Sequence, residues 1–336
     1  MKKFKLYITL LLIGIFIIPS CNDEWEDEQY KKAVSFVKCG VVKVYVKYNS
    51  EGGNVLFKVP VQVTGTTTNL SNINVTIDVD PDTIPSLNFD RFRLREDLYF
   101  KLLEPSFYEF ESMTTTIPSG SDVGIFMLNL KLEGMDLIDK YILPIEILSA
   151  SNSAVLGRKH FSKSLMQIIP FNDYSGRYSV SGMIYERNRP ENQQVPLTVP
   201  YRNARVVDEN TVFFFAGATE EESIEREIYK IEAKFNTADS TVTLTASDPR
   251  IKFAQQAGKF TVETKMDPVL PYLQRKYITA NLEYIYDDIS NPARPMQNRF
   301  RGPMVLEKVK KILVPEEDQQ GEILEEDIDR LYPNPY

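Results

Sequence analysis

Apolar and polar residues alternate at every second position through much of the chain between residues 33 and 170. A period of two predicts β-strands that bury one face and expose the other. We expect such strands at residues 41–46, 55–63, 73–79, 123–132, 141–148 and 164–169. About six or seven short strands in ~140 residues, with few helical stripes between them, predict an antiparallel immunoglobulin-like β-sandwich.

The first two of these strands flank a turn that contains two adjacent glycines. Residues 49–54 have the sequence Asn-Ser-Glu-Gly-Gly-Asn. Glycine readily adopts the positive φ that tight hairpin turns require. The sequence therefore predicts that residues 41–46 and 55–63 pair as one long hairpin.

A second series of strands begins near residue 172. Its opening segment, residues 174–182, carries glycines that permit sharp bending of a strand. Further strands are expected at residues 211–215, 228–235, 241–245, 259–264, 277–286 and 304–309. This series predicts an up-and-down meander closed into a lipocalin-like barrel, with a second β-sandwich as the alternative. The expected all-β chain thus has an Ig-like sandwich at 33–170 and a barrel-like or sandwich domain at 172–312.

The first twenty residues form a different pattern. Three lysines precede an apolar run at residues 6–18, and Ser20 precedes Cys21. This run is shorter than the ~20 apolar residues that span a membrane. Residues 1–20 therefore predict a cleaved signal peptide rather than a transmembrane helix.

The end of this segment resembles a bacterial lipobox, although Pro19 departs from the commonest pattern. The resemblance implies that the Cys21 thiol is diacylated and becomes the new N-terminus. Each buried methylene of a lipid chain contributes ~0.8 kcal/mol, so such a cysteine would anchor the protein to a membrane through lipid alone. The alternative is an ordinary cleaved signal that leaves Cys21 as a free thiol.

Charge is concentrated at the two ends of the chain. The formal net charge is −8, from 39 Lys and Arg against 47 Asp and Glu. Five carboxylates lie between Asn22 and Glu28, and eight acids with a single base lie in residues 314–336. Residues 21–32 predict a solvated acidic tether, and 313–336 an acidic tail that is disordered or docks to a partner. The body between them is nearly neutral, and the acidic balance argues against nucleic-acid binding.

The acidic tether resembles the surface-export signal of Bacteroidetes lipoproteins. The resemblance implies a lipid-anchored protein on the outer face of the outer membrane. A plain spacer remains the alternative interpretation of the same residues.

Several motifs in the first domain carry a family resemblance. They are Leu102-Leu103-Glu104-Pro105, Tyr108, Thr116-Ile117-Pro118-Ser119-Gly120 and Tyr141-Ile142-Leu143-Pro144-Ile145. Their order is similar to that in the N-terminal domain of a large group of Bacteroidetes lipoproteins, an Ig-like sandwich of unassigned activity. This chain has Leu-Glu-Pro where the group often has Leu-Pro. Residues 174–178 and 282–286 are similar, more weakly, to β-rich C-terminal domains that accompany that group.

The resemblance implies a biological setting. Members of the group are typically encoded in polysaccharide-utilisation loci, beside an outer-membrane porin and its glycan-binding lipoprotein lid. We therefore expect a non-enzymatic glycan-binding or accessory component of a polysaccharide-uptake system, with a glycan or outer-membrane uptake proteins as partners. The alternatives are an adhesin or scaffold that binds a protein partner, and a glycan hydrolase with an unrecognised carboxylate pair.

Motifs for catalysis or metal binding are weak. The chain has one histidine, His160, and lacks the Gly-x-Ser-x-Gly and His-Glu-x-x-His motifs. Glu283 with Asp287 or Asp288 is the nearest candidate carboxylate pair. Residues 78–82 imitate the start of a calcium loop, but Thr83 replaces the glycine and Phe89 the glutamate that such a loop needs. The sequence predicts no catalytic residue, no metal site and no cofactor, and a strand that runs into a turn at residues 78–82.

Aromatic residues in loops are the informative candidates for glycan binding, because strand aromatics normally fill a core. A tyrosine can stack on a sugar ring while arginine, asparagine and aspartate bind its hydroxyls. The candidates expected to line one end of the second domain are Tyr185, Arg187, Asn188, Tyr272, Tyr286, Asp288, Asn298 and Arg299.

Overall fold

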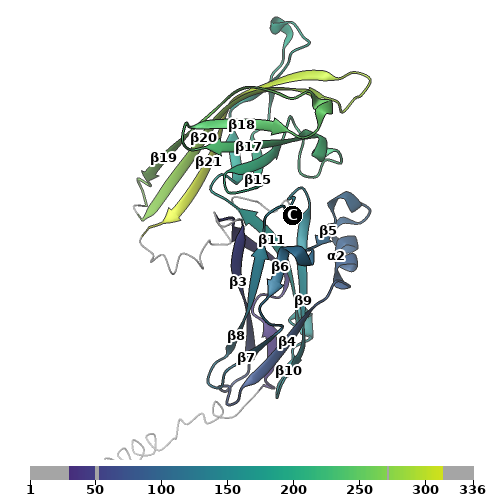
Figure 1. The fold of residues 1–336 in the computed structure, drawn as a ribbon, viewed down its shortest axis with the longest axis vertical. Helices are drawn as coiled ribbons and strands as arrows, with labels where there is room; N and C mark the ends of the chain where they lie inside the picture. Colours follow the sequence, from purple (N-terminus) through teal and green to yellow (C-terminus); the bar gives the residue numbers. More distant parts are fainter. Residues whose placement is uncertain (1–29, 50–52, 271, 313–336) are drawn as a thin grey trace, which may run out of the picture.

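A computed structural model describes residues 30–49, 53–270 and 272–312. The chain forms a two-sheet sandwich and a closed β-barrel, stacked along the long axis of the molecule (Figure 1). The prediction of an all-β fold with a sandwich followed by a barrel is confirmed. Cys21, the signal segment, most of the tether and the acidic tail lie outside the described residues. Within the described residues, no helix has the length and apolar character needed to cross a membrane.

The first domain has two layers. One sheet has the strand order β10-β1-β3-β8-β6, and the other has the order β2-β11-β9-β4-β7 with β5 beside β9. The strands are β1 (Ala33–Phe36), β2 (Gly40–Lys47), β3 (Asn54–Thr64), β4 (Ile73–Val79), β5 (Phe100–Leu102), β6 (Tyr108–Phe110), β7 (Thr114–Ile117), β8 (Val123–Lys131), β9 (Lys140–Ala150), β10 (Ala154–Val155) and β11 (Lys163–Phe171). Alternate residues of both sheets, such as Val61 and Ile145, are fully buried between the layers.

The predicted hairpin of the first two strands is wrong. Strands β2 and β3 belong to different sheets, and β2 pairs in parallel with β11 over its whole length. Val46 of β2 and Val59 of β3 lie in the same buried cluster, so the two apolar faces oppose each other across the core. Alternation predicted which face each strand buries, but it contains no information on which strand is the neighbour. Gly53 does adopt a positive φ of 74° at the connection.

The prediction of a strand that runs into a turn at residues 78–82 is confirmed, because β4 ends at Val79 and a turn at Pro81 and Asp82 leads into a short helix. Helix α2 (Thr83–Phe92) packs Leu87 and Phe92 against Phe100 and Leu165, on the outer face of the second sheet. Asp80, the candidate calcium ligand, instead accepts hydrogen bonds from Thr83 and from the Lys163 ammonium, each at 2.5 Å. In the described part of the chain, no group of three or more metal-binding side chains occurs.

Among the described residues, six single-turn 3-10 helices lie in connections between strands. They are η2 (Glu96–Leu98), η3 (Pro105–Phe107), η4 (Arg158–His160), η5 (Glu191–Gln193), η6 (Arg226–Tyr229) and η7 (Pro249–Ile251).

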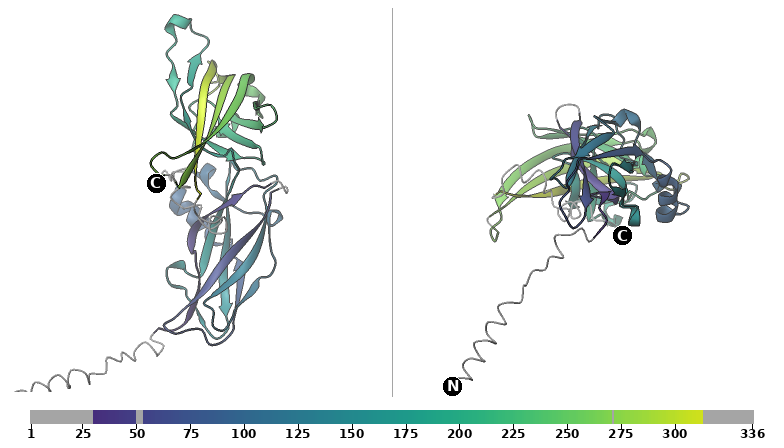
Figure 2. Two further views of the ribbon diagram at one scale, coloured as in Figure 1. Left: turned by 90° about the vertical axis from the view of Figure 1, so that its left-hand side faces the viewer. Right: turned by 90° about the horizontal axis from the view of Figure 1, so that it is seen from below.

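The second domain is an eight-stranded meander closed by pairing of its first and last strands. The ring order is β12-β15-β16-β17-β18-β19-β20-β21, and β21 pairs again with β12. The hairpin of β13 and β14 extends from β21 and projects from the barrel on the side away from the sandwich (Figure 2). The strands are β12 (Gly176–Val180), β13 (Met183–Glu186), β14 (Leu197–Thr198), β15 (Tyr201–Val206), β16 (Thr211–Phe215), β17 (Lys230–Asn236), β18 (Thr241–Ala246), β19 (Ala254–Met266), β20 (Leu273–Asp288) and β21 (Met296–Lys311).

Glycines allow β21 to pair with two different strands along its length. Strand β21 pairs with β12 at Leu306 and with β13 at Arg301. Between these contacts, a Cβ on Gly302 would lie 2.4 Å from the Cα of Gly182. Only glycine permits this close approach, which explains the glycine pattern noticed in the opening strand.

The barrel interior is filled by side chains. Tyr284 stacks on Phe300 with ring centroids 5.0 Å apart, and both rings are fully buried. Arg202 points into the same interior, where its guanidinium donates hydrogen bonds to the backbone carbonyls of Phe215 and Gly217. The barrel is therefore a packed core, as small barrels commonly are.

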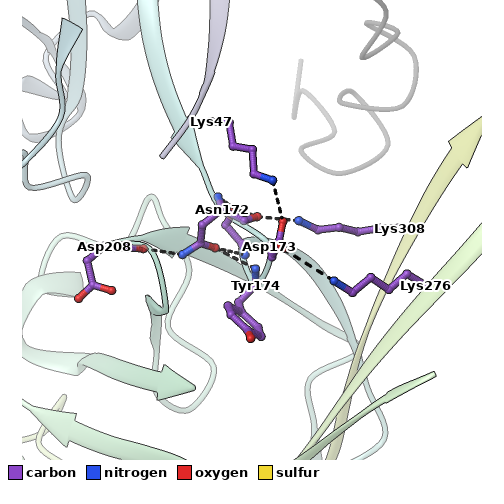
Figure 3. A network of polar contacts seen from close by, with 8 residues as sticks. Lys47, Asn172, Asp173, Tyr174, Asp208, Lys276 and Lys308 are labelled. Atoms are coloured by element: carbon purple, nitrogen blue, oxygen red, sulfur yellow. Dashed lines mark hydrogen bonds and ion pairs between the residues drawn. The ribbon is translucent and has the colours of Figure 1, made fainter. Parts of the chain in front are cut away.

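The two domains are joined at Asn172 and Asp173 (Figure 3). The Asn172 side chain accepts hydrogen bonds from the backbone N–H groups of Tyr174 and Ser175 at 2.9 and 2.7 Å. Its amide nitrogen donates to the backbone carbonyl of Asp208 at 2.7 Å. These bonds hold the linker against the barrel as soon as the chain leaves β11.

Three lysines surround the same linker (Figure 3). Lys47 from the sandwich lies 3.3 Å from the Asp173 carboxylate, and Lys276 from the barrel lies 3.8 Å from it. Burial alone would raise the pKa of Asp173, but the positive charges of these lysines outweigh burial and lower it. Lys308 donates to the Asn172 carbonyl at 2.6 Å, and its burial lowers its pKa to about 8.

The depressed pKa of Lys308 predicts a pH-dependent stability. Below pH 8 the folded protein keeps a buried ammonium, and this cost falls as the pH rises from 8 towards the ordinary lysine value. Substituting Lys308→Met removes the cost, so we expect its stabilising effect to be about 2 kcal/mol larger at pH 7.5 than at pH 9.5. Denaturant unfolding at both pH values measures the difference. Lys234→Met, on an exposed position of β17, is the control, and an equal response of both variants to pH would contradict the assignment.

Candidate functional site

A cleft of about 570 Å³ lies between the two domains. Its volume falls in the ~300–1,000 Å³ range of small-molecule binding sites. One wall is the outer face of β2 and β11 in the sandwich, and the other is the outer face of β12 and β15 in the barrel. Helix α2 and the loop at residues 218–222 also line it.

Strand alternation decides which side chains line the cleft. On β2, Val44 and Val46 fill the sandwich core, so Lys43 lies on the opposite face, in register with Gln167 of β11. On β15, Ala204 lies in the barrel core, whereas Tyr201 lies on the outer face. The cleft is thus lined by the polar half of strands whose apolar half forms the two cores.

The barrel wall carries an exposed aromatic ring. Tyr201 keeps 54% of its surface accessible, and the Arg177 guanidinium lies 3.7 Å from its ring centroid. The ring and the cation attract each other through the ring quadrupole. This pair presents a flat apolar surface next to five N–H donors, which is a combination that can bind a sugar ring and its oxygens.

The charges in the cleft are unevenly neutralised. Glu221 forms a two-point ion pair with Arg205 at 2.9 and 2.8 Å. Burial alone would raise the pKa of Glu221, but Arg205 outweighs burial and lowers it. Burial lowers the pKa of Lys140, with Glu221 acting in the opposite direction. Lys140 therefore carries a partly desolvated positive charge in the lining of the cleft.

Polar contacts between the domains fix the width of the cleft. Arg226 of the barrel is 5% exposed and donates to the backbone carbonyl of Asp97 at 2.8 Å, with the Asp97 carboxylate 3.6 Å away. Lys230 lies 3.2 Å from Asp136 of the sandwich. A small adjoining cavity of about 50 Å³ lies between these contacts and the cleft.

The residues predicted for glycan binding do not all come together. Seven of them lie near the joined ends of β13, β20 and β21, namely Tyr185, Arg187, Asn188, Tyr286, Asp288, Asn298 and Arg299. Tyr272 lies beyond the other end of β20, about 50 Å along the strand at ~3.3 Å per residue. The expectation that all eight line one end of the barrel is therefore wrong for Tyr272.

Alternation along the strands separates the remaining seven further. Tyr286 is 1% exposed and faces the barrel interior, where it is hydrogen-bonded to Asn298 at 3.4 Å. Its ring is a core side chain, so the prediction that it stacks on a sugar is wrong. Tyr185 lies opposite Arg299 in register on the outer face, and Arg299 is occupied by an ion pair with Glu283 at 2.9 Å.

The polar residues at the strand ends also have partners. Arg187 donates to the Gln297 side chain at 3.0 Å, and Asp288 accepts from the Tyr229 hydroxyl at 3.1 Å. Burial raises the pKa of Tyr229 to about 12. Asn188 is exposed in the turn after β13. None of these residues lines the interdomain cleft or the small adjoining cavity.

The candidate carboxylate pair is also separated. Glu283 is paired with Arg299, and Asp287 lies 3.1 Å from Lys252. The two acids are four residues apart on β20, or about 13 Å along a strand, beyond the ~5–9.5 Å that glycoside hydrolysis uses.

Sequence reasoning missed the cleft because its residues come from distant segments. Arg91, Lys140, Arg177 and Tyr201 belong to four different elements. None lies in a motif with fixed spacing. Two weak signals existed: a lysine that begins a buried strand, and an arginine directly after the glycine of the opening strand of the second domain.

Each of the two domains matches a known protein-family model. A family described as a domain of unknown function, DUF4973, matches residues 25–151, and a second family, described as a C-terminal domain, matches residues 162–304. No curated protein matches the chain.

Several solved structures match almost the whole chain. A Bacteroides ovatus protein of unknown function has 31% identity and a TM-score of 0.77, and the match covers 85% of this chain and 98% of that one. A multidomain Bacteroides ovatus protein that includes DUF1735 has 31% identity and a TM-score of 0.75, over 87% and 99% of the two chains. An auxiliary nutrient binding protein from Bacteroides thetaiotaomicron has 26% identity and a TM-score of 0.73, over 83% and 94%.

The buried Arg226 contact predicts that the two domains unfold together. Substituting Arg226→Ala leaves the Asp97 carbonyl and carboxylate without this donor, and we expect a loss of about 2–4 kcal/mol in the free energy of unfolding. Denaturant unfolding measures the loss, and limited proteolysis near residue 172 reports separation of the domains. Arg250→Ala, which removes an exposed pair with Asp248, should leave both readouts unchanged. Equal behaviour of the two variants would show that Arg226 does not hold the domains.

Proposed function

We propose that this chain, which belongs to the same family as two Bacteroides ovatus proteins that match most of its length, is a non-enzymatic glycan-binding component of a polysaccharide-uptake system. In this proposal the protein is anchored to the outer membrane through a lipid on Cys21 and exposed at the cell surface. The interdomain cleft holds the glycan. A solved relative that bears the name auxiliary nutrient binding protein supports a binding role for this architecture.

The observation that carries the proposal is the exposed Tyr201 ring in the wall of the cleft. Single exposed apolar side chains are common on protein surfaces, so the exposure of this ring is informative because it lies in a cleft. Here the ring is 54% exposed, is stabilised by Arg177 and lies beside polar side chains from both domains. Stacking of a sugar on this ring would bury its apolar face and leave hydroxyls for Asn203 and Gln167, which line the same cleft.

The cleft also suits binding better than hydrolysis. Glu221 forms an ion pair with Arg205, and this pair holds the acid in its charged form. A general acid for glycoside cleavage needs a raised pKa. The lowered pKa of Glu221 favours a structural role for this carboxylate.

Removing the Tyr201 ring should weaken glycan binding. We expect Tyr201→Ala to lower affinity about tenfold, the equivalent of ~1.4 kcal/mol, for any polysaccharide that the protein retains in affinity electrophoresis. Calorimetry on the corresponding oligosaccharide measures the change. Tyr272→Ala is the matched control, since this tyrosine is 39% exposed and does not line the cleft.

Two results would contradict this proposal. Equal binding by wild type and Tyr201→Ala would remove the cleft as the glycan site. Failure of the protein to bind any polysaccharide, with specific capture of a protein instead, would favour the adhesin or scaffold alternative.

The lipid anchor has its own test. Substituting Cys21→Ser removes the thiol that would be acylated, so the protein should move from the membrane fraction to the soluble fraction. Cys39→Ser, which changes a half-buried cysteine within the sandwich, controls for general effects of cysteine loss. Digestion of wild type by protease added to intact cells measures surface exposure. Retention of Cys21→Ser in membranes would refute the anchor.

A further inference from the structure

The cleft contains more positive charge than its carboxylates neutralise. Six basic side chains line it, namely Lys43, Arg91, Lys140, Arg177, Arg202 and Arg205. The Arg202 guanidinium donates hydrogen bonds to backbone carbonyls of the barrel, and Arg205 forms an ion pair with Glu221. Among the described residues, no ion pair within 4.0 Å joins Arg91, Lys140 or Arg177 to a carboxylate.

Two of these cations share one aromatic ring on the sandwich side. The Arg91 guanidinium lies 5.7 Å from the ring centroid of Phe92, and the Lys140 ammonium lies 6.0 Å from the same centroid. Burial lowers the pKa of Lys140 most; the glutamates Glu221 and Glu222 act in the opposite direction, and Arg91 adds a smaller lowering effect. Placing two like charges together in a partly desolvated cleft is unfavourable unless an anion completes the site.

The third cation lies on the opposite wall. Arg177 belongs to β12 of the barrel and lies over Tyr201, whereas Arg91 and Lys140 belong to α2 and β9 of the sandwich. A ligand in the cleft is therefore contacted by cation–aromatic pairs from both domains. The Arg177 guanidinium covers one face of the Tyr201 ring, so a saccharide bound beside this pair would meet the guanidinium and could direct a substituent towards Lys140.

We propose that the cleft selects acidic saccharides, whose carboxylate or sulfate group is bound by Arg177, Lys140 and Arg91. This inference rests on the proposed glycan-binding function and specifies its ligand class. Guanidinium groups bind both carboxylate and sulfate through paired N–H donors. The body of the protein is nearly neutral, so the selectivity comes from this local cluster and not from a general attraction of anions.

Matched pairs of polysaccharides test the charge requirement with the mature full-length protein. Polygalacturonan is compared with its carboxyl-reduced form, and chondroitin sulfate with its desulfated form, by affinity electrophoresis and calorimetry. We expect at least tenfold tighter binding of one acidic member over its neutralised counterpart, and weaker binding as salt rises. The first pair reports a carboxylate ligand and the second a sulfate ligand.

Variants then connect the charge requirement to the cleft. Arg177→Gln and Lys140→Met should each weaken binding of the acidic polysaccharide tenfold or more. Lys265→Met, an exposed lysine at the end of β19 paired with Glu263, should have no effect. The midpoint of thermal unfolding checks that the variants fold, and Lys140→Met should retain or raise it because a partly buried charge is removed.

The possible outcomes separate this inference from the proposed function. Equal binding of acidic and neutralised polysaccharides that depends on Tyr201 would overturn the charge selectivity and leave glycan binding intact. Acidic selectivity that is unchanged in Arg177→Gln and Lys140→Met would overturn the assignment to the cleft. Absence of binding to every polysaccharide would overturn both proposals.

Discussion

The hydrogen-bonded linker at Asn172 and Asp173 is the constraint on which the arrangement of this protein depends. A short linker between two β-domains would ordinarily allow them to move relative to each other. Here the Asn172 side chain binds the backbone of the barrel, and Asp173 is shared by a lysine from each domain. These contacts thus restrict the relative motion of the two domains at the linker.

The cleft is a consequence of the fixed arrangement of the two domains at this linker. Each wall is the outer face of a β-sheet, and the cleft lies where residues of the two domains face each other. The linker brings β12 and β15 towards β2 and β11, and the Arg226–Asp97 contact holds the domains together at a second point. Two fixed points restrict rotation of one domain on the other, which is the preorganisation that a binding site between domains requires.

Because the barrel interior is packed with side chains, only the outer faces of the barrel are available to bind a ligand. In a lipocalin-like barrel the interior can hold a small ligand. In this barrel Arg202, Tyr284 and Phe300 occupy that space, so the polar half of each strand is left as the surface available for recognition. Tyr286 illustrates the same division, since one position of register places its ring in the core instead of at the rim.

The sequence by itself determined that this chain is all-β, that a sandwich precedes a barrel, and which face of most strands is buried. These properties follow from local alternation and turn residues, which act over a few positions. Only the tertiary structure decided that β2 pairs with β11, that Tyr286 is internal and Tyr272 remote, and that Arg91, Lys140, Arg177 and Tyr201 meet. Strand partners and domain contacts depend on interactions between residues far apart in the chain, and hydrophobic periodicity carries no record of them.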